Sequence, residues 1–88
     1  MSDTNINYFK KRLIYKSNNR GLKETDIILG GFVNQNINQL NEEHLKMLDE
    51  ILNQPDIDLY NWVTQNKKTP DQYNNKIMKM IQEWLNTK

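Results

Sequence analysis

The chain has 88 residues, a length that allows one domain with a single small core and excludes two. It contains no cysteine, which excludes disulfides, thiolate metal ligands and a cysteine nucleophile. The net charge of +1 is unevenly distributed: residues 1–23 carry +5, residues 24–66 carry −7 and residues 67–88 carry +3. Such segregation of charge favours oriented docking to a partner.

The beginning of the chain bears on its location. No apolar run in the sequence is long enough to cross a bilayer, so we expect no insertion into a membrane. The first residues lack the basic and apolar regions of a secretory signal, and Asp3 precedes the first basic residue, Lys10, which is not typical of a mitochondrial presequence. We therefore expect a bacterial protein of the cytoplasm.

Two helices are predicted in the first 38 residues. Ile6, Phe9 and Leu13 recur at the spacing of one helical face and predict a helix over residues 6–18, which Gly21 would end in a left-handed conformation. A second apolar stripe predicts a helix over about residues 22–38, although its two central glycines each cost about 1 kcal/mol relative to alanine. We expect these glycines, Gly30 and Gly31, to permit close packing between helices. The stripe consists of Ile28, Leu29, Phe32, Val33 and Ile37.

Three further helices follow. Asn41 is the predicted cap of a helix that ends near Asn53, and Asp56 is the predicted cap of a short fourth helix. The segment 69–72, Thr-Pro-Asp-Gln, predicts the start of a fifth helix. The predicted fold is therefore all-α, a single-domain five-helix bundle over residues 1–88 with 1–5 and 86–88 as frayed ends. The three apolar faces consist of Leu45, Leu48, Ile51 and Leu52, then Leu59, Tyr60, Trp62 and Val63, then Tyr73, Ile77, Met80, Ile81 and Trp84.

The sequence offers no catalytic constellation. Its single histidine, His44, stands near an acidic helix start, and we interpret it as a solvated helix residue. The sequence lacks both the clustered His and Cys that bind zinc and the spaced acids of a calcium loop. Gly30-Gly31 is too sparse for a phosphate loop. We therefore predict that the chain is not an enzyme and has no catalytic or metal-binding residues.

The basic first block leaves an alternative open. Its cations are interleaved with Tyr8, Phe9 and Tyr15, a combination typical of nucleic-acid-binding surfaces. A pI near 7.9 and the acidic middle block speak against a polyanionic ligand. We favour a solvated helix face with its aromatic residues in the core. A small helical nucleic-acid-binding or regulatory module is the alternative.

Four segments together resemble a known family. In order and spacing, over about residues 9–85, the chain is similar to the succinate dehydrogenase assembly factor 2 family, whose bacterial members are called SdhE. The resemblance implies a five-helix chaperone that binds the flavoprotein subunit of succinate dehydrogenase, and in some bacteria of fumarate reductase. It implies that the chaperone promotes covalent attachment of FAD to that subunit without holding FAD stably itself, and we expect a monomer when free. The segments are Arg12-Leu13-Ile14-Tyr15, Arg20-Gly21-Leu22-Lys23-Glu24-Thr25-Asp26, Phe32, and Pro55-Asp56-Ile57-Asp58-Leu59-Tyr60-Asn61-Trp62.

The signature of the family falls on Arg20, Gly21 and Glu24, with Asp26 as a neighbour, and the resemblance implies that these residues bind the partner. The residues alone also have a structural explanation, in which Gly21 ends a helix and the two charges suit the adjacent helix ends. The match along the whole chain favours the docking role. Thr25 departs from the apolar residue common in the family. A flavin carrier or flavin-transferring enzyme is a third hypothesis.

Overall fold

The computed structural model describes residues 3–87, which form five α-helices and two short 3₁₀ helices and contain no strand. The predicted all-α five-helix bundle is therefore confirmed. Of the residues expected to fray, 3–5 and 86 lie within helices, while 1, 2 and 88 lie outside the described residues. The elements are α1 (Asp3–Asn18), α2 (Lys23–Asn36), η1 (Ile37–Gln39), α3 (Glu42–Leu52), α4 (Asp56–Val63), η2 (Asp71–Tyr73) and α5 (Lys76–Asn86).

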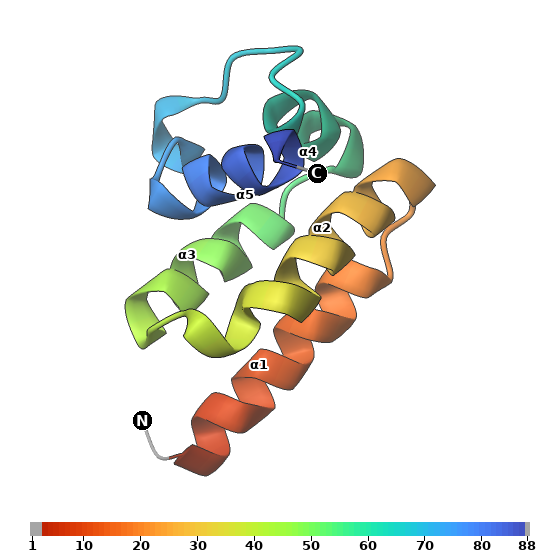
Figure 1. The fold of residues 1–88 in the computed structure, drawn as a ribbon. Coiled ribbons are helices and arrows are strands. Elements are labelled where there is room, and N and C mark those ends of the chain that lie inside the picture. Colours follow the sequence, from red (N-terminus) through yellow and green to blue (C-terminus); the bar gives the residue numbers. More distant parts are fainter. Residues whose placement is uncertain (1–2, 88) are drawn as a thin grey trace.

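The first two helices lie side by side, joined by a short turn, and α4 and α5 gather at the end of the bundle far from the start of α1 (Figure 1). The turn between α1 and α2 therefore lies near α4. The radius of gyration is 12.2 Å. A single compact domain of this length is expected to have about 12 Å, so the helices form one domain.

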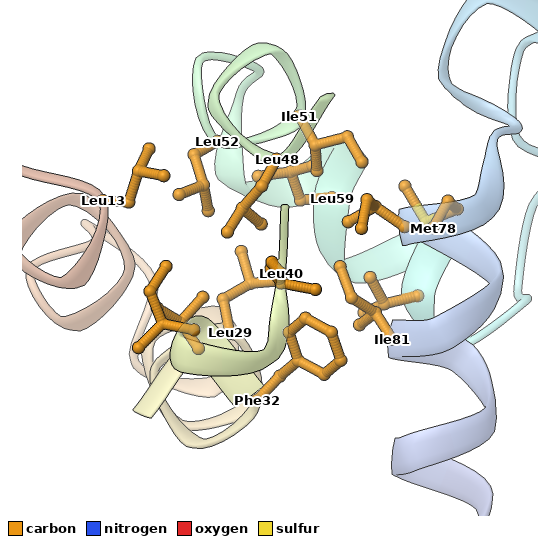
Figure 2. Packing of buried hydrophobic residues seen from close by; sticks show 14 of the residues in the cluster. Leu13, Leu29, Phe32, Leu40, Leu48, Ile51, Leu52, Leu59, Met78 and Ile81 are labelled. Atoms are coloured by element: carbon orange, nitrogen blue, oxygen red, sulfur yellow. The ribbon is translucent and has the colours of Figure 1, made fainter. Parts of the chain in front are cut away.

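The core is built largely from the predicted apolar faces, which meet between the helices (Figure 2), and it also contains Leu40 and Met78, which the prediction did not include. Burial of each large apolar side chain contributes about 1.5–3 kcal/mol, so the shared core holds the helices together. Its fully buried members include Leu13 of α1, Leu29 and Phe32 of α2, Leu48 and Ile51 of α3, Leu59 of α4, and Ile77, Met78 and Ile81 of α5.

The aromatic residues of the basic first block do not all join this core. Phe9 packs partly against it, but Tyr8 and Tyr15 are 68% and 69% exposed. The prediction that these aromatic residues lie in the core is wrong for both tyrosines. They are seven residues apart and share one face of α1, and Leu13 lies on the opposite, buried side.

The start of α5 also differs from the prediction. Segment 69–72, which predicted the helix start, contributes only to the 3₁₀ turn of η2, and α5 begins after Asn75, whose side chain accepts a hydrogen bond from the Met78 N–H at 3.0 Å. A tertiary contact explains the difference. Tyr73 stacks on Trp62 of α4, with ring centroids 5.4 Å apart, so the 3₁₀ turn is docked against α4 before the helix can begin.

The two central glycines of α2 permit close packing, as predicted. Gly30 is buried, and a Cβ atom there would lie 2.7 Å from Oδ1 of Asn18 in α1. A Cβ atom on Gly31 would lie 2.7 Å from the indole ring of Trp84 in α5. Because these distances are too short for real Cβ contacts, both glycines let neighbouring side chains approach the backbone of α2.

Candidate docking site at the α1–α2 turn

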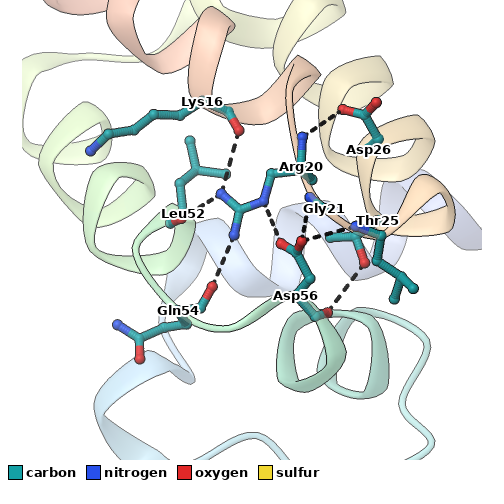
Figure 3. Close-up of polar contacts among 9 residues, drawn as sticks. Lys16, Arg20, Gly21, Thr25, Asp26, Leu52, Gln54 and Asp56 are labelled. Carbon is teal, nitrogen blue, oxygen red and sulfur yellow. Dashed lines mark hydrogen bonds and ion pairs between the residues drawn. The ribbon is translucent and has the colours of Figure 1, made fainter.

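The side chain of Arg20, just after α1, points into the molecule (Figure 3). Its Nε donates to Oδ1 of Asp56 at 2.6 Å, and its two Nη atoms donate to the carbonyl oxygens of Leu52 at 2.5 Å and Gln54 at 2.9 Å. Only 10% of the side chain is exposed. The last carbonyls of a helix lack partners within it, so the guanidinium satisfies the end of α3 while it pairs with the first residue of α4.

The Asp56 carboxylate divides its two oxygens between Arg20 and the turn. Oδ1 accepts from the guanidinium, and Oδ2 accepts from the backbone N–H of Gly21 at 2.6 Å and of Leu22 at 3.0 Å. Burial alone raises the pKa of Asp56. The hydrogen bonds from Arg20, Leu22 and Gly21, together with the Arg20 charge, outweigh burial and hold the pKa below its ordinary value.

Asp56 was predicted to cap α4, and that prediction is wrong. The capping position is Pro55, and within residues 3–87 no side chain makes the capping hydrogen bond of α4. The carboxylate is instead occupied by the α1–α2 turn, which precedes it by about 35 residues. A capping role can be inferred from neighbouring residues alone, whereas this role depends on which helices meet.

Gly21 has a different role from the predicted left-handed helix stop. No glycine in the described part of the chain has a positive φ, which there occurs only at Gln65, at 63°. Gly21 is exposed, and a Cβ atom on it would lie 3.2 Å from Oδ2 of Asp56. The small residue therefore serves the close approach of the Asp56 carboxylate to the turn backbone, and it leaves the outer side of the turn uncovered.

The two acids of the turn region differ in environment. Glu24 is exposed, whereas Asp26 is half-buried and accepts from the Arg20 backbone N–H at 3.2 Å. Thr25, between them, is buried, and its hydroxyl donates to the Asp56 carbonyl at 3.2 Å. The departure from the family at Thr25 therefore lies beneath the surface. Arg20, Gly21 and Asp26 belong to one internal network, and Glu24 points to its outside.

A shallow pocket of about 270 Å³ lies beside the turn, between α2 and α4. Leu22, Glu24, Ile57 and Tyr60 line it. Ile57 is 58% exposed, and Ile27, one helical turn after Glu24, is 61% exposed. Sequence reasoning missed this pocket. Its only signal was an isoleucine between two acids in the first turn of α4, and that signal does not show which helix faces it.

Other predicted features occupy ordinary positions. Lys16, one cation of the basic block, donates to Asp49 at 2.6 Å and to Asn53 at 2.9 Å, so its charge is used within the bundle. The backbone N–H of His44 donates to the Asn41 side chain, which caps α3 as predicted.

In the part of the chain that the structure describes, no group of three or more His, Cys, Asp or Glu is placed to hold a metal ion. No helix within residues 3–87 is long and apolar enough to span a membrane.

A known protein family matches most of the chain, including this turn. The sequence profile of a family described as the flavinator of succinate dehydrogenase matches residues 11–85. The chain belongs to this family. The resemblance drawn from the sequence is thus confirmed, and the matched range includes the turn, α4 and the pocket.

Several curated relatives of this flavinator-family chain are named succinate dehydrogenase assembly factor 2, mitochondrial. The Saccharomyces cerevisiae protein is 43% identical over 83 residues, which cover 90% of this chain and 51% of the relative. The Dictyostelium discoideum protein is 35% identical over 77 residues, covering 88% of this chain and 55% of the relative. The Danio rerio protein is 39% identical over 77 residues, covering 85% and 49%. The chain spans about half the length of the curated relatives it matches.

The predicted location in the bacterial cytoplasm is wrong. The relatives from yeast, Dictyostelium and zebrafish are all named as mitochondrial proteins. The prediction rested on the composition of the first residues. These residues do not decide the location of a chain that spans about half the length of its relatives. The alternative of a nucleic-acid-binding module gains no support from the flavinator family either.

Proposed function

We propose that this chain binds the flavoprotein subunit of succinate dehydrogenase and promotes the covalent attachment of FAD to it. The observation that carries the proposal is the match of the flavinator family over residues 11–85. This range contains the whole internal network around Arg20 and Asp56. The names of the curated relatives, assembly factors of succinate dehydrogenase, support it further. The flavoprotein subunit of fumarate reductase is a second partner of the same chemistry.

The reacting groups belong to the partner and its cofactor. In the proposed reaction the 8α-methyl group of the flavin loses a proton, and a histidine nitrogen of the flavoprotein then bonds to that carbon. The electron pair of the broken C–H bond stays on the flavin, which is left reduced. The chain acts as a monomeric chaperone that holds the immature flavoprotein where histidine and flavin meet, a contribution of orientation and not of new reacting groups. It is not an enzyme and does not bind FAD stably. An absorbance spectrum of the purified chain tests this last point, because a bound flavin would make the protein yellow.

The proposed docking surface consists of the outer side of the turn and the adjacent pocket. In this proposal Gly21 and Glu24 contact the partner directly, and their exposure supports that role. The apolar lining residues of the pocket, Leu22, Ile57 and Tyr60, accept an apolar side chain, while Glu24, which also lines the pocket, binds a cation or a hydrogen-bond donor. Arg20 contributes from beneath, because its guanidinium is bonded within the chain. Asp26 is half-buried and has one carboxylate oxygen bonded to the Arg20 N–H, so it supports the turn from the side.

Co-expression of the flavoprotein subunit with and without this chain tests the proposal. Covalent flavin is measured as fluorescence that survives denaturing electrophoresis, at limiting FAD and short times. We expect more covalent flavin with the wild-type chain. Gly21→Arg should abolish the gain, because a large side chain both crowds the Asp56 carboxylate and covers the turn. Equal flavinylation without the chain would refute the proposal for that partner.

The role of Glu24 is tested with a matched pair of variants. Glu24 and Glu43 are both exposed acids in the first turn of a helix. Replacing either one by glutamine therefore changes the net charge and the interaction with the helix dipole by the same amount. Glu24→Gln should weaken binding to the flavoprotein subunit by about tenfold, as expected for one lost charge-assisted contact. Glu43→Gln should leave binding unchanged. Similar affinities for the two variants would remove Glu24 from the docking surface.

A further inference from the structure

The α1–α2 turn depends on side chains for its backbone hydrogen bonds. Three consecutive N–H groups, those of Arg20, Gly21 and Leu22, all donate to carboxylate oxygens. Leu22 is the capping position of α2, and no side-chain capping bond forms there within the described residues. Two of the three donors are satisfied by Asp56, which belongs to α4 and not to the turn.

Asp56 is itself held in place by Arg20. The guanidinium binds Oδ1 and leaves Oδ2 to the turn, while its other nitrogens bind the carbonyl of Leu52 at the end of α3 and that of Gln54 just after it. The Asp56 carbonyl, in addition, accepts from the buried hydroxyl of Thr25. The start of α2 is therefore fastened to the start of α4 by both the side chain and the backbone of one residue (Figure 3).

The link between the starts of α2 and α4 also affects the shape of the docking surface. The pocket is lined by Leu22 and Glu24 at the start of α2, and by Ile57 and Tyr60 of α4. Asp56 adjoins Ile57 in sequence and bonds to Leu22 in space, so it sets the distance between the two pairs of lining residues. Without this link, the turn and the pocket would sample other conformations, and only a fraction of molecules would present the docking surface.

We propose that Asp56 is a positioning residue, which holds the α1–α2 turn and the adjacent pocket in the conformation that the partner binds. This inference rests on the docking function proposed above. Arg20 of the family signature acts within the same arrangement by orienting Asp56, and contact with the partner is left to Gly21, Glu24 and the pocket. If the competent conformation falls to about a tenth of the molecules when Asp56 is replaced, the affinity falls about tenfold.

Asp56→Asn is the informative variant, and Asp58→Asn is its matched control. Both acids lie in the first turn of α4, but Asp58 is exposed. Binding to the flavoprotein subunit is measured by calorimetry, and the amide signals of Gly21 and Leu22 are followed in ¹H–¹⁵N spectra. We expect Asp56→Asn to keep its helical circular dichroism, to shift both amide signals and to bind about tenfold more weakly. Asp58→Asn should match the wild type in both measurements.

A second variant covers the case in which Asp56→Asn does not fold. Asp56→Glu keeps the charge for Arg20 but displaces the carboxylate by one methylene, so the amide signals and the affinity should change together. A folded variant whose Gly21 and Leu22 signals shift while its affinity stays within twofold of the wild type would overturn the inference. Failure of the wild-type chain itself to bind the flavoprotein subunit would refute the proposed function, a separate and distinguishable result.

Discussion

Arg20→Ala should destabilise the bundle strongly, although the residue belongs to a signature expected to bind a partner. The substitution removes four hydrogen bonds from a charged donor, and the one to the Lys16 carbonyl is long, at 3.4 Å. Such a bond contributes about 1.5–3 kcal/mol in proteins when its geometry is good. These contributions are not additive, and Asp56 is 21% exposed, so water can replace part of the loss. We therefore expect a decrease of about 3 kcal/mol in the free energy of unfolding. This is the lower end of the range of about 3–5 kcal/mol for removing one partner of a buried ion pair.

This decrease is large for a domain of this size. Proteins of 88 residues have a total stability on the order of 4–13 kcal/mol. At about 4–8 °C per kcal/mol, the midpoint of thermal unfolding should fall by about 12–24 °C. Arg20→Lys should lose about half as much, because an ammonium group cannot reach three acceptors in the fork geometry of a guanidinium.

Urea denaturation followed by circular dichroism measures these changes, with Lys16→Ala as the control. Lys16, in α1, also forms a long-range ion pair, with Asp49, but the side chains of that pair are 27% and 25% exposed. Its loss should cost at most about 1 kcal/mol. If Arg20→Ala costs no more than Lys16→Ala, the internal network is not a structural clamp, and Arg20 is free to act at the surface.

Three further outcomes are expected. Asn75→Ala should destabilise the chain by about 1 kcal/mol in urea, because Asn75 caps α5 through the Met78 N–H; an unchanged midpoint would contradict this cap. Gly30→Val should cost about 2 kcal/mol, since the buried glycine lies against Asn18 of α1, and a more stable variant would show that α1 can move away. The folded pKa of Asp56 is depressed, so its contribution is fully present above about pH 4 and is lost as the pH falls through that pKa. The difference in unfolding free energy between the wild type and Asp56→Asn should therefore shrink on acidification. A difference that grows would contradict the lowered pKa of Asp56.

Local patterns were sufficient to predict most of the fold. The spacing of apolar residues in α3 identified Leu45, Leu48, Ile51 and Leu52, all of which are buried, and Asn41 caps that helix as predicted. These signals are readable because a helix places residues three and four apart on one face, and a cap acts within one turn. The start of α5 was mispredicted because the stacking of Tyr73 on Trp62 competes with a good local start signal.

The candidate site required the tertiary structure. The sequence identifies Arg20 and Asp56 as charged residues beside helix ends, but they lie 36 positions apart, and each has an acceptable local role. Which partner a charged side chain selects depends on which helices meet and how far water is excluded between them. Residue spacing thus determined that this chain is a helical bundle with a polar turn after α1. Only the packing of α4 against that turn decided that Arg20 binds inward and that Gly21 and Glu24 remain at the surface.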